Sequence, residues 1–153
     1  PYTTLFRSGF PRIADAVNTL CGSEYKIFQK SWFAPSVMRQ WYGDRYRVWF
    51  PKLAIGGKAV ANGWNNRLSD DGTYIYEYNE DADLVDPVGD DGDPNDIRIT
   101  FAKSADPVTR IQAYRFVGVF RRISNSEDGT RKRYQRIETV FPIHRTPCLP
   151  IHR

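Results

Sequence analysis

The sequence predicts an α+β domain: a small, mostly antiparallel β-barrel with one N-terminal helix. Apolar residues recur at helical spacing in one segment near the N-terminus. The later segments are short, rich in β-branched and aromatic residues, and separated by turn residues, which is typical of strands. The 153 residues have room for one such domain, and 41% hydrophobic with 26% charged residues indicates a folded chain.

The helix is expected over Pro11–Cys21. Ile13, Val17 and Leu20 lie on one apolar stripe with Cys21, which we read as a small buried hydrophobe. Pro11 suits a first helical turn, and Gly22 suits the position just past the end. Because the helix is short, it must pack against another element to persist.

Six strands are expected after the helix. The stretch Tyr114–Phe120 is apolar on both faces, which predicts a central strand, and Gly118 within it predicts a bend. The turn residues Glu127–Gly129 predict an antiparallel hairpin from the last two strands. The expected strands are Tyr25–Phe28, Arg45–Phe50, Thr73–Tyr78, Ile97–Lys103, Ala113–Ile123 and Lys132–Phe141.

The two ends of the chain are set apart from this domain. Residues 1–8 resemble the translation of a sequencing-adapter oligonucleotide, so we exclude them from fold reasoning and expect natural sequence from Gly9. Residues 9–141 form the expected single domain, and residues 142–153 form an extended, proline-containing tail. We expect the chain to be a fragment of a longer protein.

Composition excludes several classes of protein. No apolar run approaches the roughly 20 residues of a membrane helix, and no basic-then-apolar leader is visible. Two cysteines and two histidines nearly exclude a disulfide framework or a four-ligand zinc site. We therefore expect a cytoplasmic protein with no membrane, metal or cofactor.

The search for catalytic residues yields no assignment. Both histidines lie in the C-terminal tail, so a Ser-His-Asp or Cys-His arrangement has no centre. No phosphate loop is present. Asp96 and Lys103 flank one expected strand and imitate a nuclease motif, but Phe101 stands where its second carboxylate belongs. A metal-dependent nuclease stays open as an alternative.

Charge is unevenly distributed along the chain. Residues 1–60 carry a net charge of +6, residues 61–100 carry −9 and residues 101–153 carry +7, for a total of +4. Such basic blocks favour a nucleic-acid partner. The acidic segment 81–96 is read as a solvated loop; holding calcium, or repelling the phosphate backbone from one face, is the alternative.

Aromatic residues in the first basic block suggest a base-binding pocket. Four tryptophans are hard to bury together in about 145 residues, and rings with nearby amides can stack on a flipped base and read its edge. The competing interpretation is that the rings form the core and the asparagines form turns. The candidate pocket residues are Trp49, Trp64, Asn65 and Asn66.

Basic residues beside these rings, and around the last hairpin, are candidates for phosphate contacts. A plain solvated surface is the alternative. The candidates are Arg45, Arg47, Arg121, Arg122, Arg131, Lys132 and Arg133. Tyr74, Tyr76 and Tyr78 alternate along one strand and could form a platform for bases or sugars, or cap the core. This leaves a carbohydrate- or protein-binding barrel as another alternative.

Three stretches carry a family resemblance: Ile97–Lys103, Tyr114–Phe120 and Tyr134–Ile137. They resemble a domain attached to prokaryotic restriction and HNH-type nucleases, which is similar in layout to the PUA-like readers of modified bases, the group of SRA, YTH and EVE domains. The resemblance implies a small barrel with a flanking helix and an aromatic pocket for an altered base. The predicted function is a DNA-binding module that recognises a modified or flipped base, within a restriction or defence protein whose nuclease lies elsewhere.

Overall fold

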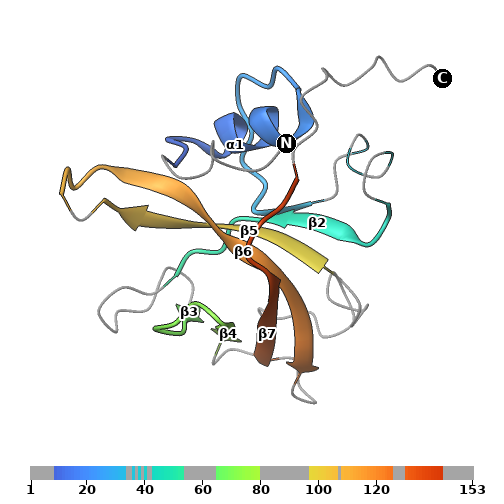
Figure 1. Cartoon of the computed structure of the whole chain (residues 1–153), viewed down its shortest axis with the longest axis vertical. Coiled ribbons are helices and arrows are strands. Elements are labelled where there is room, and N and C mark those ends of the chain that lie inside the picture. The colour runs from blue at the N-terminus through green and yellow to red at the C-terminus, as the bar shows by residue number, and fades with distance from the viewer. Residues whose placement is uncertain are drawn as a thin grey trace.

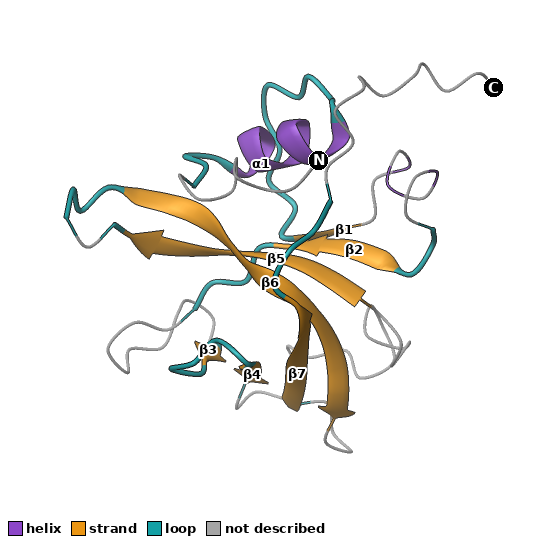
Figure 2. Cartoon of the chain, in the orientation of Figure 1, coloured by secondary structure: helices purple, strands orange, loops and turns teal. Residues whose placement is uncertain are grey.

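The computed structural model describes residues 9–33, 36, 38, 40, 43–53, 65–79, 97–106, 108–125 and 130–142. Its elements lie around one curved sheet (Figures 1 and 2). In chain order they are α1 (Ile13–Cys21), β1 (Trp32–Phe33), β2 (Tyr46–Trp49), β3 (Arg67–Leu68), β4 (Tyr74–Tyr78), β5 (Ile97–Ala105), β6 (Gln112–Asn125) and β7 (Arg131–Glu138). Within the described ranges, no helix is both long and apolar enough to cross a bilayer.

The seven strands form one sheet in the order β1-β2-β5-β6-β7-β4-β3. Every neighbouring pair is antiparallel except β2 and β5, which run parallel. The α+β class and the mostly antiparallel sheet are confirmed, as are the central place of β6 and its hairpin with β7.

The expected barrel is not closed. The sheet has two edges, β1 and β3, each only two residues long. One isolated parallel bridge joins Leu53, after β2, to Asn66, before β3. Since one bridge cannot form a ladder, the curved sheet brings its two ends together without a continuous seam.

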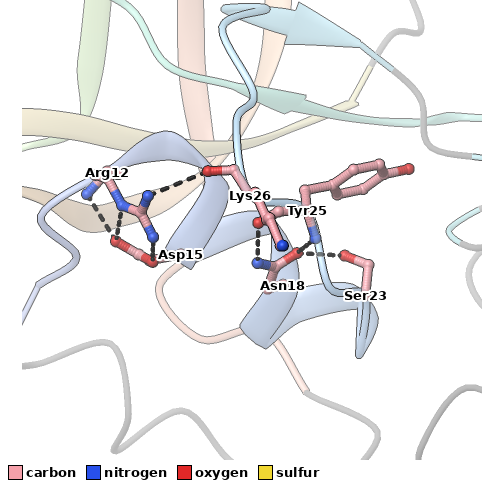
Figure 3. Close-up of polar contacts among 6 residues, drawn as sticks. All are labelled: Arg12, Asp15, Asn18, Ser23, Tyr25 and Lys26. Carbon is pink, nitrogen blue, oxygen red and sulfur yellow. Dashed lines mark hydrogen bonds and ion pairs between the residues drawn. The ribbon is translucent and has the colours of Figure 1, made fainter.

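The helix begins two residues later than predicted, with Arg12 at its N-cap and Pro11 outside it. The Arg12 amide donates to Asp15 Oδ2 at 3.1 Å, and the Arg12 guanidinium donates to Asp15 Oδ1 at 2.8 Å (Figure 3). The hydrogen bond from the Arg12 side chain is the main cause that lowers the pKa of the Asp15 carboxyl, and the positive charge of Arg12 lowers it further. Gly22 ends the helix with a left-handed φ of 64°, as its position predicted.

The segment Tyr25–Phe28 is a loop, so the strand predicted there is wrong. Backbone groups of Tyr25 and Lys26 are already bound by Asn18 of the helix and by its N-cap residue, Arg12. Asn18 Nδ2 donates to the Tyr25 carbonyl at 2.9 Å, and Asn18 Oδ1 accepts from the Tyr25 amide at 2.8 Å (Figure 3). Arg12 donates to the Lys26 carbonyl at 3.1 Å. A strand would need the same backbone groups for a neighbouring ladder.

The other expected strands occur with shifted ends, and two further strands, β1 and β3, were not predicted. Two-residue strands offer too few positions for an alternation to be recognised. Ser36, Met38 and Gln40 also have helical backbone, in a segment that was given no expected element. The acidic segment 81–96, the first eight residues and positions 143–153 lie outside the described residues.

The two faces of the sheet bury separate clusters. On one face, Val17 and Leu20 of α1 pack with Val48, Ile99 and Val119 of the sheet. Cys21 is buried in this same cluster, as its place on the apolar stripe predicted. On the other face, a smaller cluster is built from large rings, and its buried members are Trp49, Ile75, Phe120 and Tyr134.

Gly118 allows β6 to bend between these clusters. Its φ is 138°, a conformation that L side chains rarely adopt. A Cβ added there would lie 2.5 Å from Arg136 Cδ and 3.0 Å from the Glu138 carbonyl oxygen. The register between β5 and β6 shifts beside it, between Thr100 and Phe101. The bend predicted at Gly118 is therefore present, and it requires glycine.

Candidate nucleic-acid interface

Strand alternation gathers aromatic and cationic side chains on the face of the sheet that α1 does not cover. Residues paired across neighbouring strands share a face, and every second residue along a strand returns to it. We call this the inner face, and the side that carries α1 the outer face. The inner face carries Trp32, Arg47, Trp49, Asn66, Leu68, Ile75, Glu77, Arg98, Thr100, Phe120, Arg122, Lys132, Tyr134 and Arg136.

Arg98 lies at the centre of the inner face among three rings. Its side chain is 3% exposed, and its Cζ is 4.7 Å from the ring centroids of both Trp49 and Tyr134. The Trp32 ring is 5.3 Å away. Burying a guanidinium is costly, and desolvated cation–π contacts return about 2 kcal/mol or more. The arginine and its three rings therefore form a packed layer beneath any ligand that binds to this face.

Tyr134 links the ring cluster to a carboxylate. Its hydroxyl donates to Glu77 Oε1 at 3.1 Å. Burial, and then the nearby Glu77 charge, raise the pKa of the Tyr134 hydroxyl far above its usual value, against the smaller opposing effect of Arg98 and Arg122. The phenol is therefore neutral at any physiological pH and serves Glu77 as a fixed donor.

Four buried polar atoms on the inner face have no hydrogen-bond partner in the part of the chain that the structure describes: Trp32 Nε1, Asn66 Oδ1, Arg98 Nε and Arg122 Nη1. The Arg98 side chain makes other contacts, whereas the remaining three atoms lie on the same face around it. The Asn66 and Arg122 side chains are each only 6% exposed. Orphaned buried polar atoms are rare in folded proteins, because each costs about 1–3 kcal/mol. Unsatisfied donors and an unsatisfied acceptor on the same face are what a polar ligand would satisfy.

The predicted pocket residues do not all reach this face. Trp49 lies on it but is 4% exposed, with Arg98 and the Tyr134 ring, at 4.7 Å, packed against it. Asn66 lies on it, whereas Asn65 is on the other side of the chain, where its Oδ1 accepts from Arg67 Nε at 3.4 Å. Trp64 lies outside the described residues.

The predicted phosphate contacts divide between the two faces. Arg122 and Lys132 are buried on the inner face, and Arg47 is half-buried there, with its Cζ 5.5 Å from the Trp32 ring. The other four are exposed; Arg45 precedes β2, and three lie on the outer face, namely Arg121, Arg131 and Arg133.

Sequence reasoning missed Arg98 and Trp32 as members of the site. Arg98 reaches the inner face because β5 pairs in parallel with β2, so that Arg98 lies opposite Arg47 and next to Trp49. Trp32 reaches it through the short pairing of β1 with β2. Neither pairing leaves a local pattern; the available hint was an arginine inside an otherwise apolar strand.

The residues of the nuclease alternative are not brought together in the described ranges. Lys103 is exposed, with its Nζ 5.7 Å from the Tyr114 ring, and Asp96 lies outside those ranges. The described residues contain no group of three or more His, Cys, Asp or Glu side chains that could hold a metal ion.

Comparisons with known proteins point to one family. The sequence model of the SET and RING associated (SRA) domain matches residues 7–143. Among solved structures, the 5-hydroxymethylcytosine-specific restriction enzyme AbaSI is similar, with a TM-score of 0.62 and 22% identity, over 85% of this chain and 38% of that chain. At this identity the likeness shows the fold, and the chain spans well under half of the AbaSI chain. A comparison with curated proteins found no match.

Proposed function

The chain belongs to the SRA family of DNA-binding, modified-cytosine readers, and on that premise we propose that its inner face receives a modified cytosine flipped out of duplex DNA. The observation that carries the proposal is a group of three orphaned atoms on that face: Trp32 Nε1, Asn66 Oδ1 and Arg122 Nη1. A flipped base is read through hydrogen bonds to its Watson–Crick edge, with rings against its plane.

Three of the orphaned atoms, those of Trp32, Asn66 and Arg122, complement that edge in kind. Cytosine presents one donor, its amino group, and two acceptors, its ring nitrogen and carbonyl oxygen. Asn66 Oδ1 accepts from the amino group, while Trp32 Nε1 and Arg122 Nη1 donate to the two acceptors. Trp49 is packed against Arg98, and Trp32, which is only half-buried, contacts the base through its in-plane N–H rather than through its ring face.

The charges of the inner face suit the phosphates that accompany the base. Five cations lie there against the carboxylate of Glu77: Arg47, Arg98, Arg122, Lys132 and Arg136. Arg47 is half-buried and lies beside Trp32, whereas Arg98, Arg122 and Lys132 are buried. We therefore assign Arg47 to the phosphate beside the flipped nucleotide, and Arg122 to the base itself.

The chain would act as the reading module of a longer restriction or defence protein in the cytoplasm. Its coverage of only 38% of the AbaSI chain supports this, since the remainder of that enzyme has no counterpart here. Cleavage would then belong to a part of the protein beyond these residues.

Two adjacent asparagines provide a direct test. The full chain would be titrated against otherwise identical duplexes with one plain, methylated, hydroxymethylated or glucosylated cytosine, at two salt concentrations. The wild-type chain should prefer at least one modified duplex. Asn66→Ala should lower that preference about tenfold, since a lost readout contact costs on the order of 1–3 kcal/mol.

Asn65→Ala is the matched control, because Asn65 lies beside Arg67 on the other side of the chain and should keep the full preference. Equal loss of preference in both variants, or in neither, would contradict the assignment of Asn66. Wild-type binding without any preference would contradict base reading itself.

A further inference from the structure

A second cationic surface lies on the outer face, over strands that α1 does not reach (Figure 1). The odd-numbered positions of β7 and the even-numbered positions of β4 point to this side, opposite Tyr134 and Ile75. We call it the tyrosine–arginine face, and it consists of Arg67, Tyr74, Tyr76, Tyr78, Arg131 and Arg133.

The tyrosines and arginines of this face are stacked in register. Tyr76 lies between Arg67 and Arg133 on the neighbouring strands, and Tyr78 lies opposite Arg131. The Arg131 Cζ is 5.0 Å from the Tyr78 ring centroid, and the Arg133 Cζ is 5.6 Å from that of Tyr74. A guanidinium held flat on a ring keeps its N–H groups directed outward, where they can bind an anion.

This face is open to solvent and strongly positive. The three arginines are exposed, and Tyr76 is 42% exposed. Glu77, the carboxylate within β4, belongs to the inner face. The turn between β3 and β4 carries Asp71. Its carboxylate accepts hydrogen bonds at 2.9 Å from Ser69 Oγ and from the Thr73 amide, and so stabilises the turn itself.

We propose that the tyrosine–arginine face is a second, sequence-independent site for the phosphate backbone of duplex DNA, so that one domain holds two DNA segments on opposite sides of its sheet. Charge complementarity selects the partner: two exposed arginines about 7 Å apart along β7, with a third on β3, fit a regular polyanion. The proposal goes beyond base reading, and it rests on the proposed function only in that the inner face must hold a duplex, modified or plain, for bridging to occur.

The inner and outer sites cannot bind the same stretch of DNA, with the base on one face and its neighbouring phosphates on the other. On β7, Lys132 points to the inner face while Arg131 and Arg133 point to the outer face. Because consecutive side chains of a strand leave opposite sides of the sheet, a duplex resting on one face cannot rest on the other without wrapping the edge. The outer arginines therefore require a separate DNA segment.

The first test is stoichiometry and bridging with the full chain and a plain 20-base-pair duplex. In excess duplex at low salt, sedimentation should give two duplexes per chain, and immobilised duplex carrying bound protein should capture a second, labelled duplex. One duplex per chain would overturn the proposal, whether the chain is a monomer or a dimer.

The second test removes the charges. Arg131→Gln with Arg133→Gln should abolish bridging, weaken binding of plain duplex about tenfold, and reduce the slope of log affinity against log salt by about two. Arg131→Lys with Arg133→Lys should restore most of that slope. The matched control is Lys103→Gln with Arg110→Gln, which removes two exposed cations near the turn between β5 and β6 and should still bridge; unchanged bridging in the Arg→Gln pair would overturn the proposal.

Two competitors define the partner. Polyglutamate at equal charge should displace the second duplex far less well than DNA does, since it lacks the fixed phosphate spacing. Equal displacement by polyglutamate, or binding of a glycan that persists in 1 M salt, would overturn the assignment to DNA. A chain that bridges without preferring a modified base would support this site while contradicting the proposed function.

Discussion

The inner and outer faces use the same residue types under opposite conditions. On the inner face, Arg98 is buried among Trp32, Trp49 and Tyr134. On the outer face, Arg131 and its partner ring are in contact with water. An arginine on a ring is therefore a structural element in one place and an accessible cation in the other, and burial decides which.

The difference matters for energy as well as for recognition. Desolvation makes each inner contact strong and each orphaned atom costly, so the inner face should be both rigid and selective. The outer contacts are screened by water and salt, so they should add little to stability and should bind without discrimination. Substitutions on the two faces should therefore differ by several kcal/mol.

The largest expected effect is that of Trp49→Ala. It would leave a void among Arg98, Tyr134 and the rest of the inner cluster, and truncation of a buried tryptophan costs about 3–5 kcal/mol. Urea denaturation would measure the loss, with Trp49→Phe as a milder control. A loss under about 1 kcal/mol would show that the ring is not part of a packed interior.

Tyr134→Phe should have an intermediate and pH-dependent effect. Near neutrality it removes the hydrogen bond to Glu77, worth about 1 kcal/mol. Because folding raises the pKa of Tyr134, the stability it contributes is complete below about pH 10 and is lost as the pH rises, since the unfolded chain releases the proton first. Denaturation at pH 8 and pH 11 should show a smaller alkaline loss for the variant; equal losses would contradict the burial of the hydroxyl.

The smallest expected effect is that of Tyr76→Ala. The ring is 42% exposed and lies outside both buried clusters, so its removal should change the free energy of unfolding by no more than about 0.5 kcal/mol. The same urea titration measures it. A loss above 2 kcal/mol would mean that this ring is structural, and the contrast between the faces would fail.

Much of the fold could be predicted because its signals are local. The helix ending at Gly22, the bend at Gly118 and the hairpin of β6 with β7 all follow from residues close together in the chain. Closure of the barrel could not be judged in this way, because it depends on pairing between distant edges. The strand predicted at Tyr25–Phe28 is wrong because Asn18 binds its backbone, a contact that no periodicity reveals.

The candidate site was predictable in composition but not in arrangement. The basic, ring-rich composition, together with the resemblance to the modified-base readers, predicted a domain that binds DNA, and the SRA family match confirms the resemblance. It could not assign the neighbours Arg121 and Arg122, or Asn65 and Asn66, to their faces. Strand alternation determines only that two consecutive side chains point to opposite faces of the sheet. Which of the two is buried depends on the parallel pairing of β2 with β5 and on the curvature of the sheet, and both are properties of the tertiary structure.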